Sequence, residues 1–234
     1  MNITIFIWRV RTGSIPFAIA RMALDRFALR KVAGLTFYKL LGTGKGETFT
    51  PRDADLRQWG LLIVGSEAAI TEVKSSPLVR RWAARATESA HFDLQTLSSH
   101  GQWAGREPFS TGDESSVRSK PAGAVAAITR ARIKTSKNLR FWRAVPPVIE
   151  ALDTAPGLIA AIGIGEAPIG LQGTFSLWSD AQSLRNFAYK SDAHQKAITA
   201  TKEIGWYSEE LFARFSVASA SGRVNGIAVG NTAD

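Results

Sequence analysis

Among the residues of this 234-residue chain, His194 is the one best placed for cofactor chemistry. It lies in a predicted helix, 179–204, and the residues that share its face by helical periodicity are mostly apolar: Leu184, Phe187, Ala197, Ile198 and Thr201. A neutral imidazole in an apolar pocket suits an axial bond to haem iron. The same placement suits a core histidine satisfied by a hydrogen bond, so the pattern leaves both interpretations open.

Two further features could contribute to a ligand site beside this helix. Gly163 and Gly165 alternate in a predicted strand, so one face of that strand carries no side chains. That face could accommodate a flat ligand or the close approach of another backbone. Arg214, in the predicted last strand, could pair with a carboxylate such as a haem propionate, or form a surface ion pair.

Several chemistries are excluded by what the chain lacks. It has no cysteine, which rules out disulfides, iron–sulfur clusters, cysteine-ligated zinc and thiolate-ligated haem. The glycine-rich segments 42–46 and 163–168 do not have the spacing of a phosphate-binding or dinucleotide-binding loop. The chain has three histidines, and we expect His91 and His100 to lie at the surface, whereas His194 lies on the apolar helical face described above.

The elements that must position these residues repeat once along the chain. Alternating β-branched and aromatic residues predict strands, and helical periodicity predicts helices. In the first half, the order is strand, helix, strand, strand, helix, strand, predicted at 2–10, 14–29, 35–41, 58–64, 66–87 and 91–97. The second half has the same order, predicted at 124–133, 138–152, 158–164, 174–177, 179–204 and 211–217.

This repetition predicts an α+β fold made of tandem ferredoxin-like βαββαβ units. We place the first unit at 1–103, a polar linker at 104–121, the second unit with the candidate haem site at 122–226, and a tail at 227–234. Each unit forms a four-stranded antiparallel sheet with helices on one face, and its other face needs cover. Packing the two sheets together gives the dimeric α/β-barrel arrangement within one chain.

Charge and hydropathy set expectations for partners. The chain has a net charge of +9, and residues 1–33 hold six basic residues and one acidic residue. No apolar run is long enough to span a bilayer, and the apolar start is interpreted as a strand rather than a signal peptide. We therefore expect a cytoplasmic protein. Its basic faces suit either plain solvation or contact with a polyanion, such as an anionic membrane surface or a nucleic acid.

Long sequence motifs carry a family resemblance over nearly the whole chain, apart from about the last dozen residues. The N-terminal motifs are GLTFYKLLGTGKGE-x-FTP (34–51) and GQWAGREPF (101–109). The C-terminal motifs are FW-x-x-VP (141–146), PGL (156–158), GIGE-x-P (163–168), TFS-x-W (174–178), FAY-x4-H (187–194) and GWYSEELFARF (205–215). Together they resemble spheroidene monooxygenase, the acyclic carotenoid ketolase family.

The resemblance implies an O2-dependent haem monooxygenase that acts on an acyclic carotenoid of spheroidene type or a similar apolar polyene. It marks the histidine of the FAY-x4-H motif, His194, as the axial ligand. With it we group Phe187, Gly163, Gly165 and Arg214 as candidate haem-binding residues. An external electron donor is expected, because no flavin or nicotinamide motif is present. A membrane-dissolved substrate also implies peripheral contact with an anionic inner membrane, through the helix 14–29.

Two other functions remain as alternatives. The first is a non-catalytic protein of the same fold that binds haem or an apolar ligand. The second is RNA binding, because RNA-recognition domains share the βαββαβ order and the chain is basic. RNA binding is disfavoured, since it needs aromatic residues on an open sheet face, and two fused units should bury theirs against each other. The distal catalytic residues and the oligomeric state do not follow from the sequence.

Overall fold

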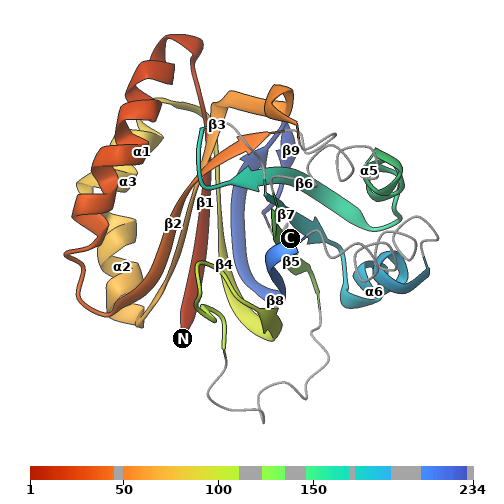
Figure 1. Cartoon of the computed structure of the whole chain (residues 1–234). Coiled ribbons are helices and arrows are strands. Elements are labelled where there is room, and N and C mark those ends of the chain that lie inside the picture. The colour runs from red at the N-terminus through yellow and green to blue at the C-terminus, as the bar shows by residue number, and fades with distance from the viewer. Residues whose placement is uncertain (45–49, 111–122, 135–145, 169–171, 191–206, 231–234) are drawn as a thin grey trace.

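A computed structural model describes residues 1–44, 50–110, 123–134, 146–168, 172–190 and 207–230 (Figure 1). The first half has the predicted βαββαβ order, with its second helix in two parts. Its strands are β1 (Asn2–Val10), β2 (Leu35–Gly44), β3 (Ala54–Gly65) and β4 (Ala86–Gly101). Its helices are α1 (Ile15–Leu29), α2 (Glu67–Ser75) and α3 (Pro77–Ala83), with short 3-10 turns η1 (Thr12–Ser14) and η2 (Pro51–Asp53).

The single helix predicted at 66–87 is wrong, because the chain forms two helices there. Ser66 caps α2, and its Oγ accepts a hydrogen bond from the Ala69 backbone N–H at 3.2 Å. Pro77 then opens α3, and Ser76 caps it by accepting from the Val79 N–H. Proline disfavours helical backbone in the residue before it, and Ser76 has extended angles. The apolar periodicity runs across this break and hides it.

The second half repeats the strand order. Its strands are β5 (Val125–Ile133), β6 (Leu158–Gly165), β7 (Gly173–Trp178) and β8 (Tyr207–Val224), and β9 (Ile227–Ala228) follows as a short addition. Its helices are α5 (Pro146–Asp153) and α6 (Ala181–Lys190). The remainders of the helices predicted at 138–152 and 179–204 lie outside the described residues.

The two four-stranded sheets join at both edges and close into a barrel. The strand order is β4-β1-β3-β2-β6-β7-β5-β8-β9, and β4 also pairs with β8. The shorter seam joins β2 to β6, where Gly42, Thr43 and Gly44 lie opposite Gly165, Ile164 and Gly163. The longer seam joins β4 to β8 from Ala90–Gly222 to Gly101–Leu211. Every pairing is antiparallel, so the predicted tandem ferredoxin-like, fused-barrel fold is confirmed.

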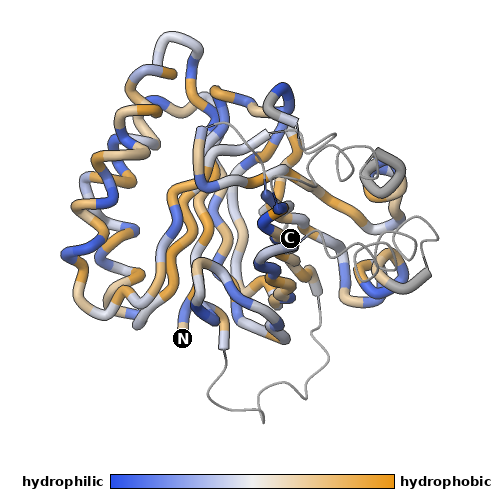
Figure 2. The backbone as a smooth tube through the Cα atoms, in the orientation of Figure 1, coloured by the Kyte–Doolittle hydropathy of each residue, from blue (hydrophilic) through white to orange (hydrophobic). Residues whose placement is uncertain are grey.

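The core has an inner compartment and two outer compartments. Inward-facing residues of all eight barrel strands form the inner one, among them Ile5, Phe92, Ile128 and Phe175. Outward-facing residues of the first-half sheet pack against α1, α2 and α3. Those of the second-half sheet pack against α5 and α6, on the opposite side of the barrel (Figure 1). Figure 2 shows how the apolar residues concentrate in the strands.

Part of the segment predicted as a polar linker belongs to the inner compartment. Phe109 is fully buried, and its ring lies edge-on to Phe215 with 5.0 Å between the ring centroids. Trp103 is also buried and packs against Phe37. Residues 111–122 lie outside the described residues, so the division of the chain at 104–121 stays a prediction.

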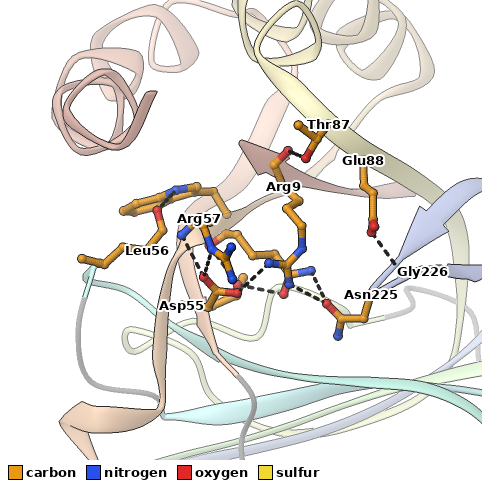
Figure 3. Close-up of polar contacts among 11 residues, drawn as sticks. Arg9, Asp55, Leu56, Arg57, Thr87, Glu88, Asn225 and Gly226 are labelled. Atoms are coloured by element: carbon orange, nitrogen blue, oxygen red, sulfur yellow. Dashed lines mark hydrogen bonds and ion pairs between the residues drawn. The ribbon is translucent and has the colours of Figure 1, made fainter. Parts of the chain in front are cut away.

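The turn between β8 and β9 is tied to the first-half sheet (Figure 3). The Asn225 side-chain oxygen accepts hydrogen bonds from Arg9 at 2.8 Å and from Gln58 at 3.0 Å. Arg9 also pairs with Asp55 at 2.9 Å, and the Gly226 N–H donates to Glu88. The end of the described chain is therefore part of the barrel. Among the described helices, none has the length and apolar character needed to cross a bilayer.

Candidate ligand-binding face

The structure brings four of the five predicted site residues to the second half, on β6, α6 and β8. Gly163 and Gly165 are buried in β6, Phe187 is partly buried on α6, and Arg214 is partly buried on β8. His194 lies outside the described residues, so its placement stays a prediction. The four described residues can be related to one another through the register of the second-half sheet.

The outward face of this sheet begins with a row of mostly large side chains on which the helices pack. Strand register places these residues side by side across β6, β7, β5 and β8: Leu158, Trp178, Val125 and Ser216. Trp178 is fully buried, and its ring lies 5.4 Å from that of Phe187 on α6. Leu184 of α6 and Leu152 of α5 belong to the same cluster. This row anchors both helices to the sheet.

The next two rows contain small side chains. The second row across the same four strands is Ala161, Ser176, Ala127 and Arg214. The third row is Gly163, Thr174, Thr129 and Phe212. Together they form a low surface, which we call the small-residue floor. Arg214 and Phe212 are its only large side chains, and both come from β8.

The first-half sheet has no such floor. A comparable row across β2, β3, β1 and β4 is Leu40, Leu61, Phe6 and His91, and the next row includes Trp59 and Trp8. These side chains fill the layer beneath α1, α2 and α3. Since both halves share one topology, the difference lies in side-chain volume alone. The small-residue floor can accept a flat group that the first-half sheet would exclude.

The chemistry of the floor fits a flat, mainly apolar ligand with a carboxylate at its edge. Ala127, Ala161 and Gly163 present no polar side-chain atoms. The guanidinium of Arg214 can bind a carboxylate through two hydrogen bonds. Phe212 is 40% exposed beside it and offers an aromatic surface. The residues of the floor therefore fit the macrocycle and propionate of haem. An axial ligand would have to come from another element.

Of the described histidines, His91 lies on the first-half sheet, whereas His100 lies at the β4–β8 seam, directly opposite Phe212 of the small-residue floor. His91 is partly buried in the first-half row beside Phe6, and its Nδ1 lies 2.9 Å from the Ser221 hydroxyl. His100 is exposed at the end of β4. In the described part of the chain, no group of three or more His, Cys, Asp or Glu side chains is arranged to hold a metal ion.

The barrel interior has little empty space. An apolar cavity inside it has about 280 Å³ of empty space, including the part open to solvent, and is lined by residues such as Ile5, Leu62, Ile128 and Phe175. The protein's own side chains fill most of the interior, so the outward face is the better candidate for a ligand the size of haem.

One charged cluster was missed by the sequence analysis. Arg130 projects into one end of the barrel with its side chain 1% exposed, and it pairs with Glu166 at 2.8 Å and Glu209 at 2.5 Å. Lys39 pairs with the other oxygen of Glu166 at 2.5 Å. The indole of Trp103 donates to Glu166 and stacks beneath the Arg130 guanidinium. Glu166 and Trp103 belong to motifs quoted above, which was the available signal.

Both carboxylates of this cluster are held in the ionised form. Burial raises the pKa of the Glu166 carboxyl, but hydrogen bonds from Lys39 and Trp103 and the nearby cationic charges hold it below its ordinary value. Burial also raises the pKa of Glu209, and two backbone N–H donors together with Arg130 bring it below its ordinary value. A paired, ionised carboxylate is a poor proton donor, so this cluster fits a clamp at the barrel end better than acid catalysis.

Comparison with known proteins identifies close relatives. The chain is 39% identical over 213 residues to a spheroidene monooxygenase of Rhodobacter capsulatus, covering 90% of this chain and 87% of that protein. It is 35% identical over 216 residues to one from Cereibacter sphaeroides, covering 90% of this chain and 64% of that protein. A third match, from Rubrivivax gelatinosus, is 35% identical over 190 residues. No protein-family model matches the chain.

Solved structures agree on the fold. An aldoxime dehydratase superposes with a TM-score of 0.56 at 11% identity, covering 92% of this chain and 80% of that one. A second aldoxime dehydratase structure, in complex with butyraldoxime, also gives 0.56, at 12% identity and with 79% of its chain covered. At such low identity, the likeness extends to the fold alone.

Proposed function

Because the chain belongs to the spheroidene monooxygenase family, we propose that it is a haem-dependent monooxygenase that inserts oxygen into an acyclic carotenoid or a similar apolar polyene. The observation that carries the haem part of this proposal is the small-residue floor with Arg214 at its edge. The relatives' names carry the substrate part. A second function on the same face, non-catalytic binding of haem or another apolar ligand, is separated from this one by the experiment below.

The residues divide the work of holding the haem. The floor, including Ala127, Ala161 and Gly163, would lie against the macrocycle, and Arg214 would bind a propionate. Phe187, held against Trp178, would form a wall on the helical side. His194 of the FAY-x4-H motif would supply the nitrogen that binds the iron, as the resemblance to the family implies.

When bound, haem iron supplies the chemistry of O2 activation. The protein would contribute an apolar, water-poor surface and a fixed orientation for ligand and substrate. Incorporating one atom of O2 into the substrate and reducing the other to water consumes two electrons and two protons. An external electron donor would supply the electrons, because the chain carries no recognisable flavin or nicotinamide motif.

The test combines a visible spectrum with a turnover assay. The purified protein is reconstituted with haem and examined for a Soret band. It is then supplied with spheroidene, O2 and a reducing system, and products are examined by mass spectrometry for incorporated oxygen. The proposal expects a Soret band and an oxygenated product. A Soret band without product would favour the non-catalytic binder, and the absence of both would contradict the proposal.

The ligand assignment is tested by replacing each histidine in turn. We expect His194→Ala to lose the Soret band and turnover while keeping the wild-type far-UV circular dichroism spectrum. The matched controls, His91→Ala and His100→Ala, should keep the band. If His194→Ala retains a full Soret band and turnover, the axial ligand lies elsewhere and His194 is a structural residue.

A further inference from the structure

Helix α1 exposes apolar side chains on the side facing away from the protein. Its inward side buries Ala18, Met22, Asp25 and Leu29 against the first-half sheet and α3. On its outward side, Ile19 is 43% exposed, Leu24 is 51% exposed and Phe27 is 62% exposed. Figure 1 shows α1 along the outside of the molecule, beside α3.

This arrangement departs from that of an ordinary surface helix. A helix packed on one side normally presents charged and polar residues to water on the other. Among the exposed residues of α1, Arg26 alone is charged, and the others on the outward side are apolar: Pro16, Ile19, Ala20, Ala23, Leu24 and Phe27. We call this set the α1 outward surface. Single exposed apolar residues are common, but a contiguous set on one helix indicates a binding surface.

The charges beside this surface are almost all positive. Arg26, Arg30 and Lys31 are exposed at its margin, as are Arg80 on the neighbouring α3 and Arg85 just after that helix. The one acidic residue of α1, Asp25, is buried and paired with Arg21 and Arg81, and it accepts a hydrogen bond from the Trp82 indole. Within the described residues, no ion pair engages Arg26, Arg30 or Lys31.

We propose that the α1 outward surface docks on an anionic lipid bilayer, with Leu24 and Phe27 in the apolar layer and Arg26, Arg30 and Lys31 among the lipid phosphates. Apolar side chains bordered by basic ones match the two layers of a membrane interface. Arginine and lysine also attract anionic lipid head groups electrostatically. This inference rests on α1 and α3 alone and does not depend on the function proposed above.

A second copy of the chain is a poorer occupant of the same surface. In a symmetric dimer, the α1 outward surface of one copy would face that of the other. The arginines and lysines at its margins would then face like charges, and the described part of α1 offers no exposed acidic residue to balance them. Like charges placed together at an interface oppose association. An anionic bilayer satisfies the apolar and the basic residues together.

The test is co-sedimentation of the whole protein with vesicles of phosphatidylcholine, alone or mixed with phosphatidylglycerol. We expect binding to the mixed vesicles, weaker binding at high salt, and little binding to phosphatidylcholine alone. Leu24→Ser with Phe27→Ser should weaken binding about 10-fold or more, since both apolar insertions are lost. Arg26→Gln with Arg30→Gln should weaken it roughly 10- to 30-fold, at about fivefold for each basic residue.

Matched controls separate docking from general effects. Ile227→Ser removes an apolar residue on β9 that is 44% exposed, and Arg52→Gln with Arg223→Gln removes two exposed positive charges elsewhere. Both controls should bind as the wild type does. Equal weakening by variants and controls would overturn the proposal. Vesicle binding by the α1 variants at the level of the wild type would also overturn it. A third contrary result would be a wild-type protein that does not bind vesicles but self-associates, with the self-association abolished by Phe27→Ser. The haem spectrum should be the same in all variants.

Discussion

Arg214 on β8 lies directly opposite Ala127 on β5, on the outward face of the second-half sheet. This pairing places the one cationic side chain of the small-residue floor beside one of its smallest residues. The aliphatic part of a long arginine side chain can lie along an apolar surface such as the Ala127 methyl group. The pair therefore defines the edge of the candidate site and can be tested from both sides.

Filling the floor should expel the haem. Ala127→Leu places a branched side chain where the macrocycle would lie, and overpacking of this kind costs about 1–3 kcal/mol. We expect haem binding to weaken roughly 5- to 150-fold, measured by titration of the Soret band. Because Ala127 is buried in the apolar cluster under α5 and α6, we also expect the unfolding midpoint to fall. Ala218→Leu, at an exposed position of the neighbouring strand β8, is the control. A lower unfolding midpoint with unchanged haem affinity would mean that the floor serves helix packing instead.

Removing the charge of Arg214 should weaken haem binding more modestly. Because the side chain is only partly buried, its pair with a propionate is worth about 1 kcal/mol. We expect Arg214→Gln to raise the dissociation constant for haem about fivefold and Arg214→Lys to raise it less, with the position of the Soret band unchanged. Arg223→Gln, further along β8, should have no effect. Equal affinities for the glutamine variant and the wild type would remove Arg214 from the site.

Local sequence patterns predicted most of the elements, because each follows from residues close together in the chain. The strand predicted at 2–10 matches β1, and that at 158–164 differs from β6 by one residue. The last strand was predicted at 211–217, whereas β8 extends over Tyr207–Val224. Its outer parts are rich in serine and alanine, and they are held by partners far away in sequence on β4 and β5. Composition alone does not reveal such pairing.

The candidate site was only partly predictable for the same reason. The glycines of β6 are visible in the sequence, but the small-residue floor also needs Ser176, Ala127 and Thr129 from other strands. Alanine, serine and threonine are common residues, and only the register shows that these lie side by side. The burial of Phe109 within a polar segment was missed likewise, since a single aromatic residue has no periodicity.

Disruption of the Arg130 cluster should cost more stability than loss of an ion pair at the surface. Arg130→Met leaves Glu166 and Glu209 close together without their shared cation, and breaking a buried pair in this way costs about 3–5 kcal/mol. We expect a loss of that size in the free energy of unfolding by urea. Arg9→Met, which removes a pair with Asp55 that is 21% exposed on both sides, should cost less than about 1 kcal/mol. Similar costs for the two variants would contradict the clamp assigned to Arg130.

The same cluster should make stability depend on pH in the acidic range. The pKa of Glu166 in the folded protein lies below its ordinary value of 4.5, so folding favours the ionised carboxylate. The stabilisation is therefore fully present above the ordinary pKa and is lost as the pH falls through the lower, folded-state pKa.

Glu166→Gln removes this titration. We expect the variant to have a lower free energy of unfolding than the wild type at about pH 7. The gap between the two free energies should narrow below the ordinary pKa of the carboxyl. Urea unfolding at a series of pH values measures both. Glu72→Gln, at an exposed position on α2, should follow the wild-type curve. Parallel curves for Glu166→Gln and the wild type would show that the carboxylate of Glu166 gains nothing from its partners in the fold.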